Sequence, residues 1–441
     1  MPPQNPQVVI IGAGAAGLAA MRELGRAGCS VLCLEARNRI GGRIYTRHDP
    51  LLPIPIELGA EFVHGRPREI WDIVDAANLT AYDIAGRAVH IEGGQVRDQG
   101  DAWEHIERVM DDMRRAADSG EDSSFQEFIE RTSHSEETKR LASAYVESFN
   151  AARKETIGIA SLAHEARASE QIGGGRSFRI LNGYESVPLY LLRGVEDWRA
   201  KLRLNAIVDR IQWQHGAVAV NVRFPDGGDA ESIHAKCAIV TVPLGVLRAA
   251  PEANGAIRFD PEPANALRAA RRLAFGQVAR IVLRFREAIW RDNEEVADAG
   301  FLLSDETRFP TWWTTLPVHA NVITGWSAGP RSDDLLGKPK AEIVAEAVAA
   351  LARITGQRRE RLESLLEQAY YHDWYSDPFA RGAYSYAPAG ALGARDALAE
   401  PVEDTLFFAG EAAETGGHGA TVHGAIMSGK RAARQAIESL E

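Results

Sequence analysis

The sequence predicts an α/β fold joined to a largely helical part (α/β + α). Three observations support this prediction. A run of β-branched residues at 8–11 leads into a Gly-x-Gly-x-x-Gly turn, an Ala- and Leu-rich helix and a second apolar strand at 31–34. From about residue 85 to residue 187, the glycine-rich α/β sequence gives way to a sequence that predicts helices. Apolar strands and glycine turns return after residue 204, so we expect the α/β part to be discontinuous in the chain.

The bulk properties are those of an ordinary soluble globular protein. The chain has 441 residues, which predicts two or three domains, and 45% of them are hydrophobic and 25% charged. The net charge of −11 and the lack of a lysine or arginine block argue against nucleic-acid binding. No apolar run approaches the roughly 18 residues of a membrane span, and the first residues lack signal-peptide features, so we expect a cytoplasmic protein. Cys29, Cys33 and Cys237 are too few for a disulfide framework and are expected to be reduced and buried.

Residues 8–35 predict one Rossmann-like βαβ unit that binds a dinucleotide. Gly12 permits the tight turn, Gly14 lets the backbone approach a pyrophosphate, and Gly17 lets the helix pack closely on the strand. The helix N-terminus presents free N–H groups to the phosphates. Glu35 follows the second strand, 18 residues past Gly17, where a carboxylate would hold the ribose hydroxyls. An ordinary strand-to-helix turn is the alternative interpretation of the glycines alone.

The other elements follow from periodicity and turn residues. An amphipathic helix with its stripe in the core is predicted by apolar residues at spacings of three and four: Trp103, Ile106, Met110, Met113 and Ala117. A second helix is predicted at 340–354, before Gly356, and a hairpin turn at 225–228. Strands are predicted at 204–211, 212–224, 238–247, 275–285, 311–315, 324–330 and 405–408.

A second glycine cluster follows the βαβ unit, in the segment 39–43. Gly41 and Gly42 suit a loop whose backbone lies against a phosphate, while Arg43 adds charge-assisted hydrogen bonds. Together with the 12–17 turn and Glu35, this segment resembles the flavin amine oxidase superfamily, whose members bind FAD rather than NAD. Motifs similar to those of the family follow in family order over nearly the whole chain.

The resemblance implies the amine oxidase architecture. It predicts a discontinuous Rossmann-like FAD-binding domain at 1–84, 188–250 and 387–441. Residues 85–187 and 251–386 would then form a substrate-binding domain with a mixed sheet and helices.

The resemblance also implies how FAD is held, without a covalent bond. Segment 56–65 would run past the flavin ring, with Gly59 and Ala60 against it, and the backbone at Val208 would bind the adenine edge. The residues assigned to the cofactor are Gly12, Gly14, Ala15, Ala16, Gly17, Glu35, Ala36, Arg37, Gly42, Arg43, Gly59, Ala60, Glu61, Val208, Val242, Trp374, Gly410, Glu411, Thr421 and Val422.

The C-terminal motif at 405–429 completes this site. By resemblance, an apolar strand delivers Gly410 and Glu411 to the ribityl chain and phosphates. A glycine-rich turn then starts a helix near Ala420, whose positive end and Val422 N–H would stabilise negative charge on the flavin pyrimidine. Thr421 stands where monoamine oxidases have a second tyrosine of their aromatic cage.

The stretch 373–386 resembles polyamine oxidases and histone lysine demethylases of the flavin type. Tyr384 matches the tyrosine that stands beside the flavin face. Ala383 occupies the position of the cysteine that bonds to flavin in mitochondrial monoamine oxidases, which is why we expect non-covalent FAD. Glu61 and His64 would lie at the edge of the substrate cavity, although an isolated loop Glu or His is more often structural.

Arg280 is the main departure from the family. The alternation at 275–285 places it on one strand face with Val278 and Val282. Most amine-oxidising members carry a lysine there that holds a water against the flavin, and arginine is not an equivalent group. Arg280 would either preserve the water site and assist reaction with O2, or bind a substrate carboxylate or narrow the cavity. A shift of the alignment by a residue or two is the third interpretation.

The resemblance implies a FAD-dependent amine oxidase with Arg280, Tyr384, Thr421, His64 and Glu61 as candidate catalytic residues. A polyamine or a small primary or secondary amine would be oxidised to an imine, and O2 reduced to H2O2. An L-amino acid oxidase, and a flavin dehydrogenase, desaturase or binding scaffold that does not use O2, are the alternatives. A histone demethylase is disfavoured because the chain has no tail-binding insertion or basic surface. Expected partners are a small-molecule amine and O2, with no nucleic acid, membrane or metal, in a monomer or homodimer.

Overall fold

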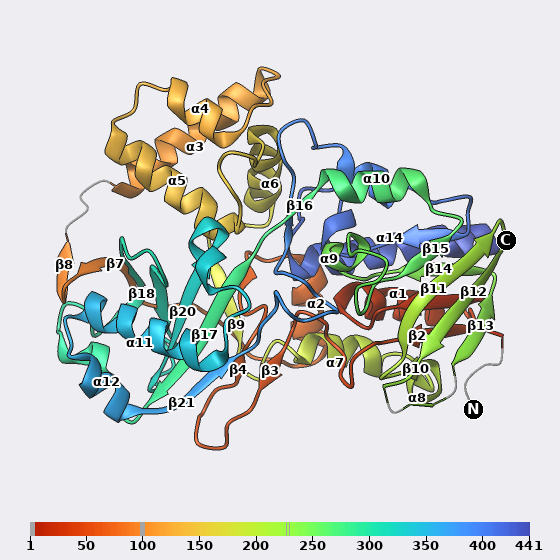
Figure 1. Cartoon of the computed structure of the whole chain (residues 1–441), viewed down its shortest axis with the longest axis horizontal. Coiled ribbons are helices and arrows are strands. Elements are labelled where there is room, and N and C mark those ends of the chain that lie inside the picture. The colour runs from red at the N-terminus through yellow and green to blue at the C-terminus, as the bar shows by residue number, and fades with distance from the viewer. Residues whose placement is uncertain (1–4, 98–101, 226, 229) are drawn as a thin grey trace.

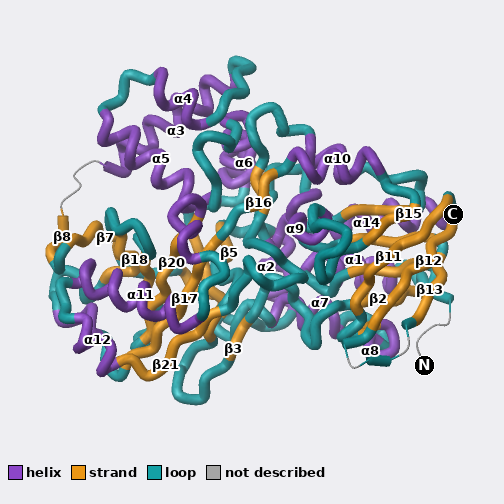
Figure 2. Tube along the Cα trace, in the orientation of Figure 1, coloured by secondary structure: helices purple, strands orange, loops and turns teal. Residues whose placement is uncertain are grey.

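The computed structural model describes residues 5–97, 102–225, 227–228 and 230–441. The chain forms two parts built on separate sheets, with a group of helices above one of them (Figure 1). Loops and short strands make up much of the region where the two parts meet (Figure 2).

The first part is organised around a five-stranded parallel sheet. Its strands lie in the order β10 (Leu202–Arg203), β2 (Val31–Leu34), β1 (Val8–Ile11), β14 (Cys237–Val240) and β23 (Leu406–Phe408). All residues from β2 to β23 are buried, as in a sheet that is covered on both faces. Val8 pairs with Val31 on one side and Cys237 on the other, which sets the register. The sheet thus joins segments from both ends of the chain.

Helices cover one face of this sheet. They are α1 (Ala15–Arg26), α2 (Arg68–Ala76), α7 (Ser186–Arg193) and α14 (Val422–Leu440), with the short α8 (Trp198–Lys201) beside β10. The predicted βαβ unit of β1, α1 and β2 is confirmed. α1 and α14 pack closely because Gly429 has no side chain. A Cβ there would lie 2.1 Å from the carbonyl oxygen of Ala16.

A four-stranded sheet covers the opposite face. Its order is β13 (Glu231–Ala235), β12 (Ala217–Arg223), β11 (Ile207–Gln214) and β15 (Arg258–Asp260), and α9 (Leu244–Leu247), α10 (Ala264–Arg272) and α13 (Ala394–Ala399) complete this layer. The prediction of one strand over 212–224 is wrong, because the chain reverses at Gly216, which takes a φ of 71°. The strand predicted at 238–247 ends at Val240, and α9 follows Pro243. Part of the turn predicted at 225–228 lies outside the described residues.

The second part contains a seven-stranded mixed sheet. Its order is β21 (Leu366–Tyr371), β17 (Val278–Phe285), β20 (Val322–Ala328), β19 (Thr311–Thr314), β18 (Ala299–Leu303), β7 (Arg87–Glu92) and β8 (Gln95–Arg97). α11 (Lys340–Thr355) and α12 (Arg359–Leu365) pack on it around buried side chains such as Ile281 and Leu351. The expectation of helix directly after residue 85 is wrong, because Val89 and Ile91 alternate into this core as a strand.

Four further helices form a group with a core of its own: α3 (Ala102–Asp118), α4 (Phe125–Arg131), α5 (Glu136–Asn150) and α6 (Ile159–Gln171). The helix predicted at 103–117 is therefore confirmed, and Met113 is fully buried in its core. Trp103 is 51% exposed, so its assignment to the core is wrong. It lies in the first turn of α3, where its ring contacts Tyr145 of α5 at 5.8 Å between centroids.

The remaining elements are short and lie mostly between the two parts. They are β3 (Thr46–Arg47) with β4 (Ile56–Glu57), β5 (Val63–His64) and β6 (Ala81–Asp83) beside β9 (Ser177–Ile180), β16 (Ala274–Phe275) with β22 (Ser385–Tyr386), and the 3-10 helices η1 (Ile289–Asp292), η2 (Gly329–Leu335) and η3 (Glu411–Ala413). Cys33 and Cys237 are buried free thiols, as expected, whereas Cys29 is partly exposed. Within the described residues, no helix combines the length and the apolar character that crossing a membrane requires.

Candidate functional site

The turn between β1 and α1 has the geometry that its glycine pattern predicts. Gly12 has a φ of 105°, in the left-handed region that favours glycine. A Cβ at Gly17 would lie 1.9 Å from the carbonyl oxygen of Gly12, so a side chain there would block the approach of helix to strand. No atom lies within 4 Å of the Cβ position of Gly14, which precedes α1 and provides no side-chain cap. The start of α1 is thus open to an anionic ligand.

Glu35 follows β2 beside this turn. Its carboxylate is buried, with the residue 3% exposed, and accepts hydrogen bonds from the N–H groups of Ala13 (2.8 Å) and Arg37 (2.9 Å), one on each oxygen. A carboxylate has about four acceptor positions, so both oxygens keep capacity for hydroxyl donors such as those of a ribose. Arg37 turns its guanidinium to Asp377, at 2.8 Å, and so links this corner to the 373–386 stretch.

The second glycine cluster lies directly against the first. The N–H of Gly41 donates to the carbonyl of Ala13 at 2.9 Å. The Cβ position of Gly42 lies 3.4 Å from the Cα of Gly14. The two loops therefore form one continuous backbone surface at the start of α1.

Arg43 and Glu411 connect the N-terminal and C-terminal motifs. Arg43 donates to the carbonyl of Ala383 at 2.6 Å and to the Glu411 carboxylate at 2.9 Å. The Ser385 hydroxyl and the Ala420 N–H donate to the other Glu411 oxygen, at 2.6 and 3.1 Å. Burial opposes ionisation of Glu411, but its arginine partners outweigh burial and lower its pKa. The structure thus pairs Arg43 and Glu411 with each other, and their expected contacts with the ribityl chain and phosphates stay predictions.

α14 begins at the same place, as predicted for a helix start near Ala420. Thr421 is its N-cap. The Thr421 hydroxyl accepts a hydrogen bond from the N–H of Gly424 (2.9 Å) and donates to the carbonyl of His418 (2.7 Å). This hydroxyl, which we assigned to the substrate cavity, is therefore engaged in capping. Val422, the first helical residue, keeps some exposed surface.

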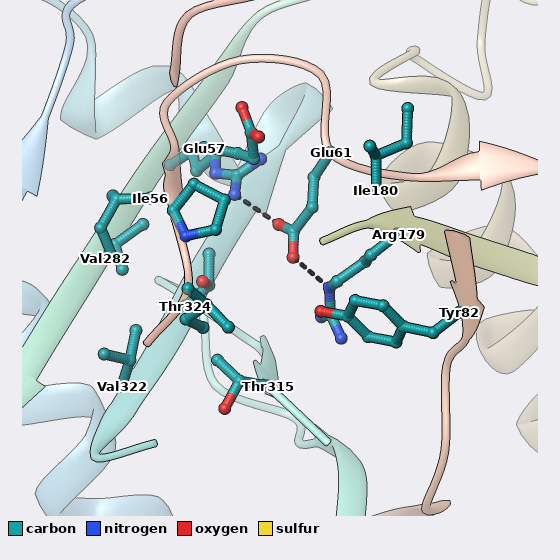
Figure 3. Close-up of a pocket in the computed structure, with 13 residues that line it drawn as sticks. Ile56, Glu57, Glu61, Tyr82, Arg179, Ile180, Val282, Thr315, Val322 and Thr324 are labelled. Carbon is teal, nitrogen blue, oxygen red and sulfur yellow. Dashed lines mark hydrogen bonds and ion pairs between the residues drawn. The ribbon is translucent and has the colours of Figure 1, made fainter. Parts of the chain in front are cut away.

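Glu61 is bound by two arginines from distant parts of the chain. Arg280 of β17 donates to Glu61 Oε2 at 2.5 Å and to the carbonyl of Gly59 at 2.6 Å. Arg179 of β9 donates to Glu61 Oε1 at 2.6 Å (Figure 3), and the indole N–H of Trp313 donates to Oε2 at 3.0 Å. Burial disfavours the carboxylate, but the two guanidinium groups outweigh burial and hold the pKa of Glu61 below its usual range. We call Arg179, Glu61 and Arg280 the arginine–glutamate cluster.

A small cavity of about 30 Å³ adjoins this cluster (Figure 3). Its wall includes the cluster, Glu57, Tyr82 and aliphatic and threonine side chains of β17 and β20. Glu57 accepts hydrogen bonds from the N–H of Tyr184 (2.8 Å) and the hydroxyl of Thr46 (2.7 Å). Burial raises the pKa of Glu57 to about 7. The volume suits ordered water rather than an organic substrate.

Aromatic rings pack against both arginines of the cluster. The guanidinium of Arg179 lies over the Phe62 ring at 5.0 Å, and that of Arg280 lies over the Trp313 ring at 5.4 Å. Phe62 and Trp313 contact each other, with 5.4 Å between their centroids, and Trp313 contacts Trp326 at 5.8 Å.

This aromatic group continues to Tyr384. His64 contacts Phe62 at 6.2 Å and Phe149 at 5.8 Å between ring centroids. The Tyr384 hydroxyl donates to the carbonyl of Phe149 at 2.9 Å. Burial lowers the pKa of His64, whose Nδ1 lies 3.0 Å from the Ser177 hydroxyl. The structure therefore brings together Glu61, His64, Arg280 and Tyr384, four of the five predicted catalytic candidates, while Thr421 lies at the adjoining helix start.

The other cofactor candidates lie along the same loops. Trp374 is buried against Gly59: its indole N–H donates to the carbonyl of Leu58 at 2.7 Å, and its ring lies 3.3 Å from the Cβ position of Gly59. Val208 is buried in β11, next to a bulge. Ala15 and Ala16 are buried at the start of α1, whereas partly exposed surface remains at Ala36, Ala60, Val242 and Gly410.

Sequence reasoning missed Arg179 and the contact of Trp313 with Glu61. Arg179 stands between Phe178 and Ile180 in a short strand. A charge between two apolar strand residues indicates a buried ion pair, but it does not identify the partner. Trp313 was predicted as part of an aromatic strand under the active-site cavity, without a contact to Glu61.

These residues fit a dinucleotide cofactor with a redox ring. They include an acceptor for ribose hydroxyls at Glu35, an open helix start for a pyrophosphate at Gly14, and the positive end of α14 for a ring that gains negative charge. In the parts of the chain that the structure describes, no group of three or more His, Cys, Asp or Glu side chains could hold a metal ion.

Comparisons with known proteins complete these observations. The model of a family described as flavin containing amine oxidoreductase matches residues 15–437. Lysine-specific histone demethylase 1 homolog 2 of Oryza sativa subsp. japonica is 29% identical, over 100% of this chain and 59% of its own length. Polyamine oxidase 4 of the same organism is 28% identical, over 97% of this chain and 88% of its own length.

A solved structure of putrescine oxidase bound to putrescine has the same fold. Its TM-score is 0.80 at 21% identity, with 98% of this chain and 99% of that chain covered. The chain spans 59% of the rice demethylase homolog and 30% of a demethylase homolog from Arabidopsis thaliana.

Proposed function

Because this chain belongs to the flavin-containing amine oxidoreductase family, we propose that it oxidises a C–N bond of a polyamine or a small primary or secondary amine to an imine. FAD, bound without a covalent link, would take two electrons from the amine and pass them to O2. The overall change converts the amine and O2 into the imine and H2O2. Water then hydrolyses the imine to an aldehyde or ketone, with release of ammonia or an amine.

The continuity of the candidate site is the observation that supports this proposal. Glu35 and the two glycine loops form one end of it. Arg43, which ends the second loop, joins Glu411 and the carbonyl of Ala383. Tyr384 follows directly and contacts the aromatic group around the arginine–glutamate cluster. A dinucleotide held at Glu35 can therefore extend toward side chains that suit an amine substrate.

The chain's own groups would bind, orient and desolvate the amine. The aromatic rings between Trp313 and Tyr384 exclude water, and desolvation shifts an amine toward its neutral form. Oxidation requires this neutral form, since the ammonium ion lacks a nitrogen lone pair. The N-terminal end of α14, at Val422, would favour negative charge on a ring placed against it.

Position 383 supports non-covalent binding. Ala383 has no nucleophilic side chain, and its carbonyl is held by Arg43. Cys33 lies in β2, where burial raises the pKa of its thiol and keeps it protonated.

Two alternatives have less support. An L-amino acid oxidase would need a cavity arginine for the substrate carboxylate, but Arg280 already binds Glu61 and the carbonyl of Gly59. The second alternative is a dehydrogenase that uses an electron acceptor other than O2. Arg280, which replaces the lysine of the family, would agree with this alternative.

Product formation by the purified holoprotein tests the proposal. In air, with monoamines, polyamines and L-amino acids offered in turn, we expect H2O2 and an aldehyde from at least one amine class and neither product from the amino acids. The same protein without substrate is the control. Amine-dependent reduction of an artificial acceptor without H2O2 would establish the dehydrogenase instead, and no reaction with any amine would refute the proposal.

A further inference from the structure

We infer that the substrate is a monoamine with an apolar body, and that the arginine–glutamate cluster of Arg179, Glu61 and Arg280 excludes diamines and polyamines by charge. This inference rests on the proposed function and narrows its substrate class.

The cluster carries a net positive charge. It contains two guanidinium cations and one carboxylate, and the two cations hold the pKa of that carboxylate below its usual range. The other hydrogen bonds of the two arginines go to neutral oxygens, namely backbone carbonyls and, for Arg179, the Tyr82 hydroxyl. Throughout the described ranges, no second carboxylate forms an ion pair with either arginine. Two positive charges and one negative charge leave one positive charge in excess.

This excess charge is buried. Arg179 and Arg280 are each 6% exposed, and the side chain of Glu61 is 10% exposed. Glu57, the other carboxyl group in the wall of the adjoining cavity, bonds a hydroxyl and a backbone N–H rather than an arginine. Burial raises the pKa of Glu57 to about 7, so it is largely neutral below that pH. Buried charges are weakly screened, and the field of the cluster therefore extends to its neighbours.

The neighbours of the cluster are the candidate substrate side chains. Trp313 bonds Glu61, and the ring contacts of Phe62 lead through His64 to Phe149. Phe149 is 56% exposed although its ring contacts His64, so this run of ring contacts ends at the protein surface. An amine bound against these rings would lie close to the buried positive charge.

A net positive charge affects one ammonium group and two ammonium groups differently. A like charge nearby disfavours the protonated form, so it promotes the deprotonation that the reacting amine must undergo in any case. The second ammonium group of a diamine would have to stay charged beside the cluster or lose its proton as well, and both are unfavourable. Phe62 and Trp313, the two rings packed on the cluster, already face its guanidinium groups and so are less available for cation–π binding of a second ammonium group.

Pentylamine and 1,4-diaminobutane provide a matched pair of substrates. They have the same number of heavy atoms and differ by one terminal positive charge. At about pH 6, where Glu57 is largely neutral, we expect kcat/KM of the wild-type holoprotein for pentylamine to exceed that for 1,4-diaminobutane by about tenfold or more.

Variants at Arg179 distinguish repulsion by the charge of the cluster from the cost of desolvating the second ammonium group of the diamine. Arg179→Gln removes one positive charge, keeps the bond between Arg280 and Glu61, and should reduce the preference for pentylamine by about tenfold. Arg179→Lys retains the charge and should keep the wild-type preference. If Arg179→Gln does not fold, Glu61→Gln raises the net charge from one to two and should increase the preference instead.

Binding provides a readout that does not depend on turnover. Each amine is titrated without O2 into holoprotein whose flavin has been reduced beforehand, so that no oxidation can occur, and its dissociation constant is taken from the change in the spectrum of the reduced flavin. Equal use of both amines by the wild type, an unchanged preference in Arg179→Gln, or no binding of pentylamine would each overturn the inference. Oxidation of both amines at equal rates would leave the proposed function intact. Oxidation of no amine would refute that function, and the ratio of the two dissociation constants would then test whether the cluster selects by charge.

Discussion

Arg43 and Glu411, 368 positions apart in the sequence, form an ion pair of 2.9 Å in the candidate cofactor site. The Glu411 residue is 4% exposed, so loss of Arg43 would remove the arginine that contacts this buried carboxylate directly. We predict that Arg43→Met lowers the free energy of unfolding by roughly 3 kcal/mol. Denaturant unfolding with excess FAD measures this loss. In a double-mutant cycle with Glu411→Gln we expect a coupling of at least about 1 kcal/mol, and additive effects would contradict a direct ion pair.

Glu35 should control the affinity for FAD rather than the oxidation step. Its carboxylate accepts two backbone N–H groups and keeps capacity for hydroxyl donors. Glu35→Gln removes the charge and half of the acceptor atoms, so we predict a Kd for FAD about tenfold to a hundredfold higher. Titration of the apoprotein, followed by flavin fluorescence, measures this change. Glu360→Gln, on the exposed end of α12, is the matched control, and an equal loss in both variants would refute the ribose site.

Thr421 should act through the start of α14. Because its hydroxyl caps the helix, we predict that Thr421→Ala lowers the free energy of unfolding by about 1 kcal/mol, while Thr421→Ser stays close to the wild type. Thermal melting of the holoprotein compares the three proteins. A large loss of kcat in Thr421→Ala with unchanged stability would instead place this hydroxyl in direct contact with substrate.

Glu57 should make the protein less stable as the pH rises from about 4.5 to about 7. Burial raises its pKa from 4.5 to about 7, so in this window the folded chain holds a proton that the unfolded chain has lost. Raising the pH then favours unfolding, by up to roughly 3 kcal/mol. Glu57→Gln mimics the protonated form and should remove this dependence. Between about pH 5 and about pH 8, the melting temperature of Glu57→Gln should therefore rise relative to that of the wild type. A difference in melting temperature that does not change with pH would contradict a raised pKa at Glu57.

Helices, strands and turns that are determined by residues close together in the sequence could be predicted. The first βαβ unit follows from its glycine spacing, because Gly12 and Gly17 each meet a local steric demand. α3 follows from its apolar periodicity, the end of α11 from Gly356, and the start of α14 from the glycine-rich turn before it. The exposure of Trp103 was missed because it depends on which surfaces later meet in the fold, whereas the break at Gly216 is a local glycine turn that was interpreted as continuous strand.

The candidate catalytic group could be predicted only in part. Resemblance placed Glu61, Arg280 and Tyr384 near one another, and the structure brings them into one group. It could not show that Glu61 is shared between two arginines. Arg179 lies 118 positions away from Glu61 and Arg280 lies 219 positions away, so their pairing depends on the packing of β9 and β17 around the 59–61 loop.

Anaerobic titration of the holoprotein is the most direct test of amine oxidation. Flavin absorbance in the long-wavelength band is followed while pentylamine is added without O2, and air is then admitted. We predict that pentylamine bleaches the band and that air restores it rapidly. A band that stays unchanged with pentylamine and with every other monoamine, diamine and polyamine would contradict amine oxidation by this protein.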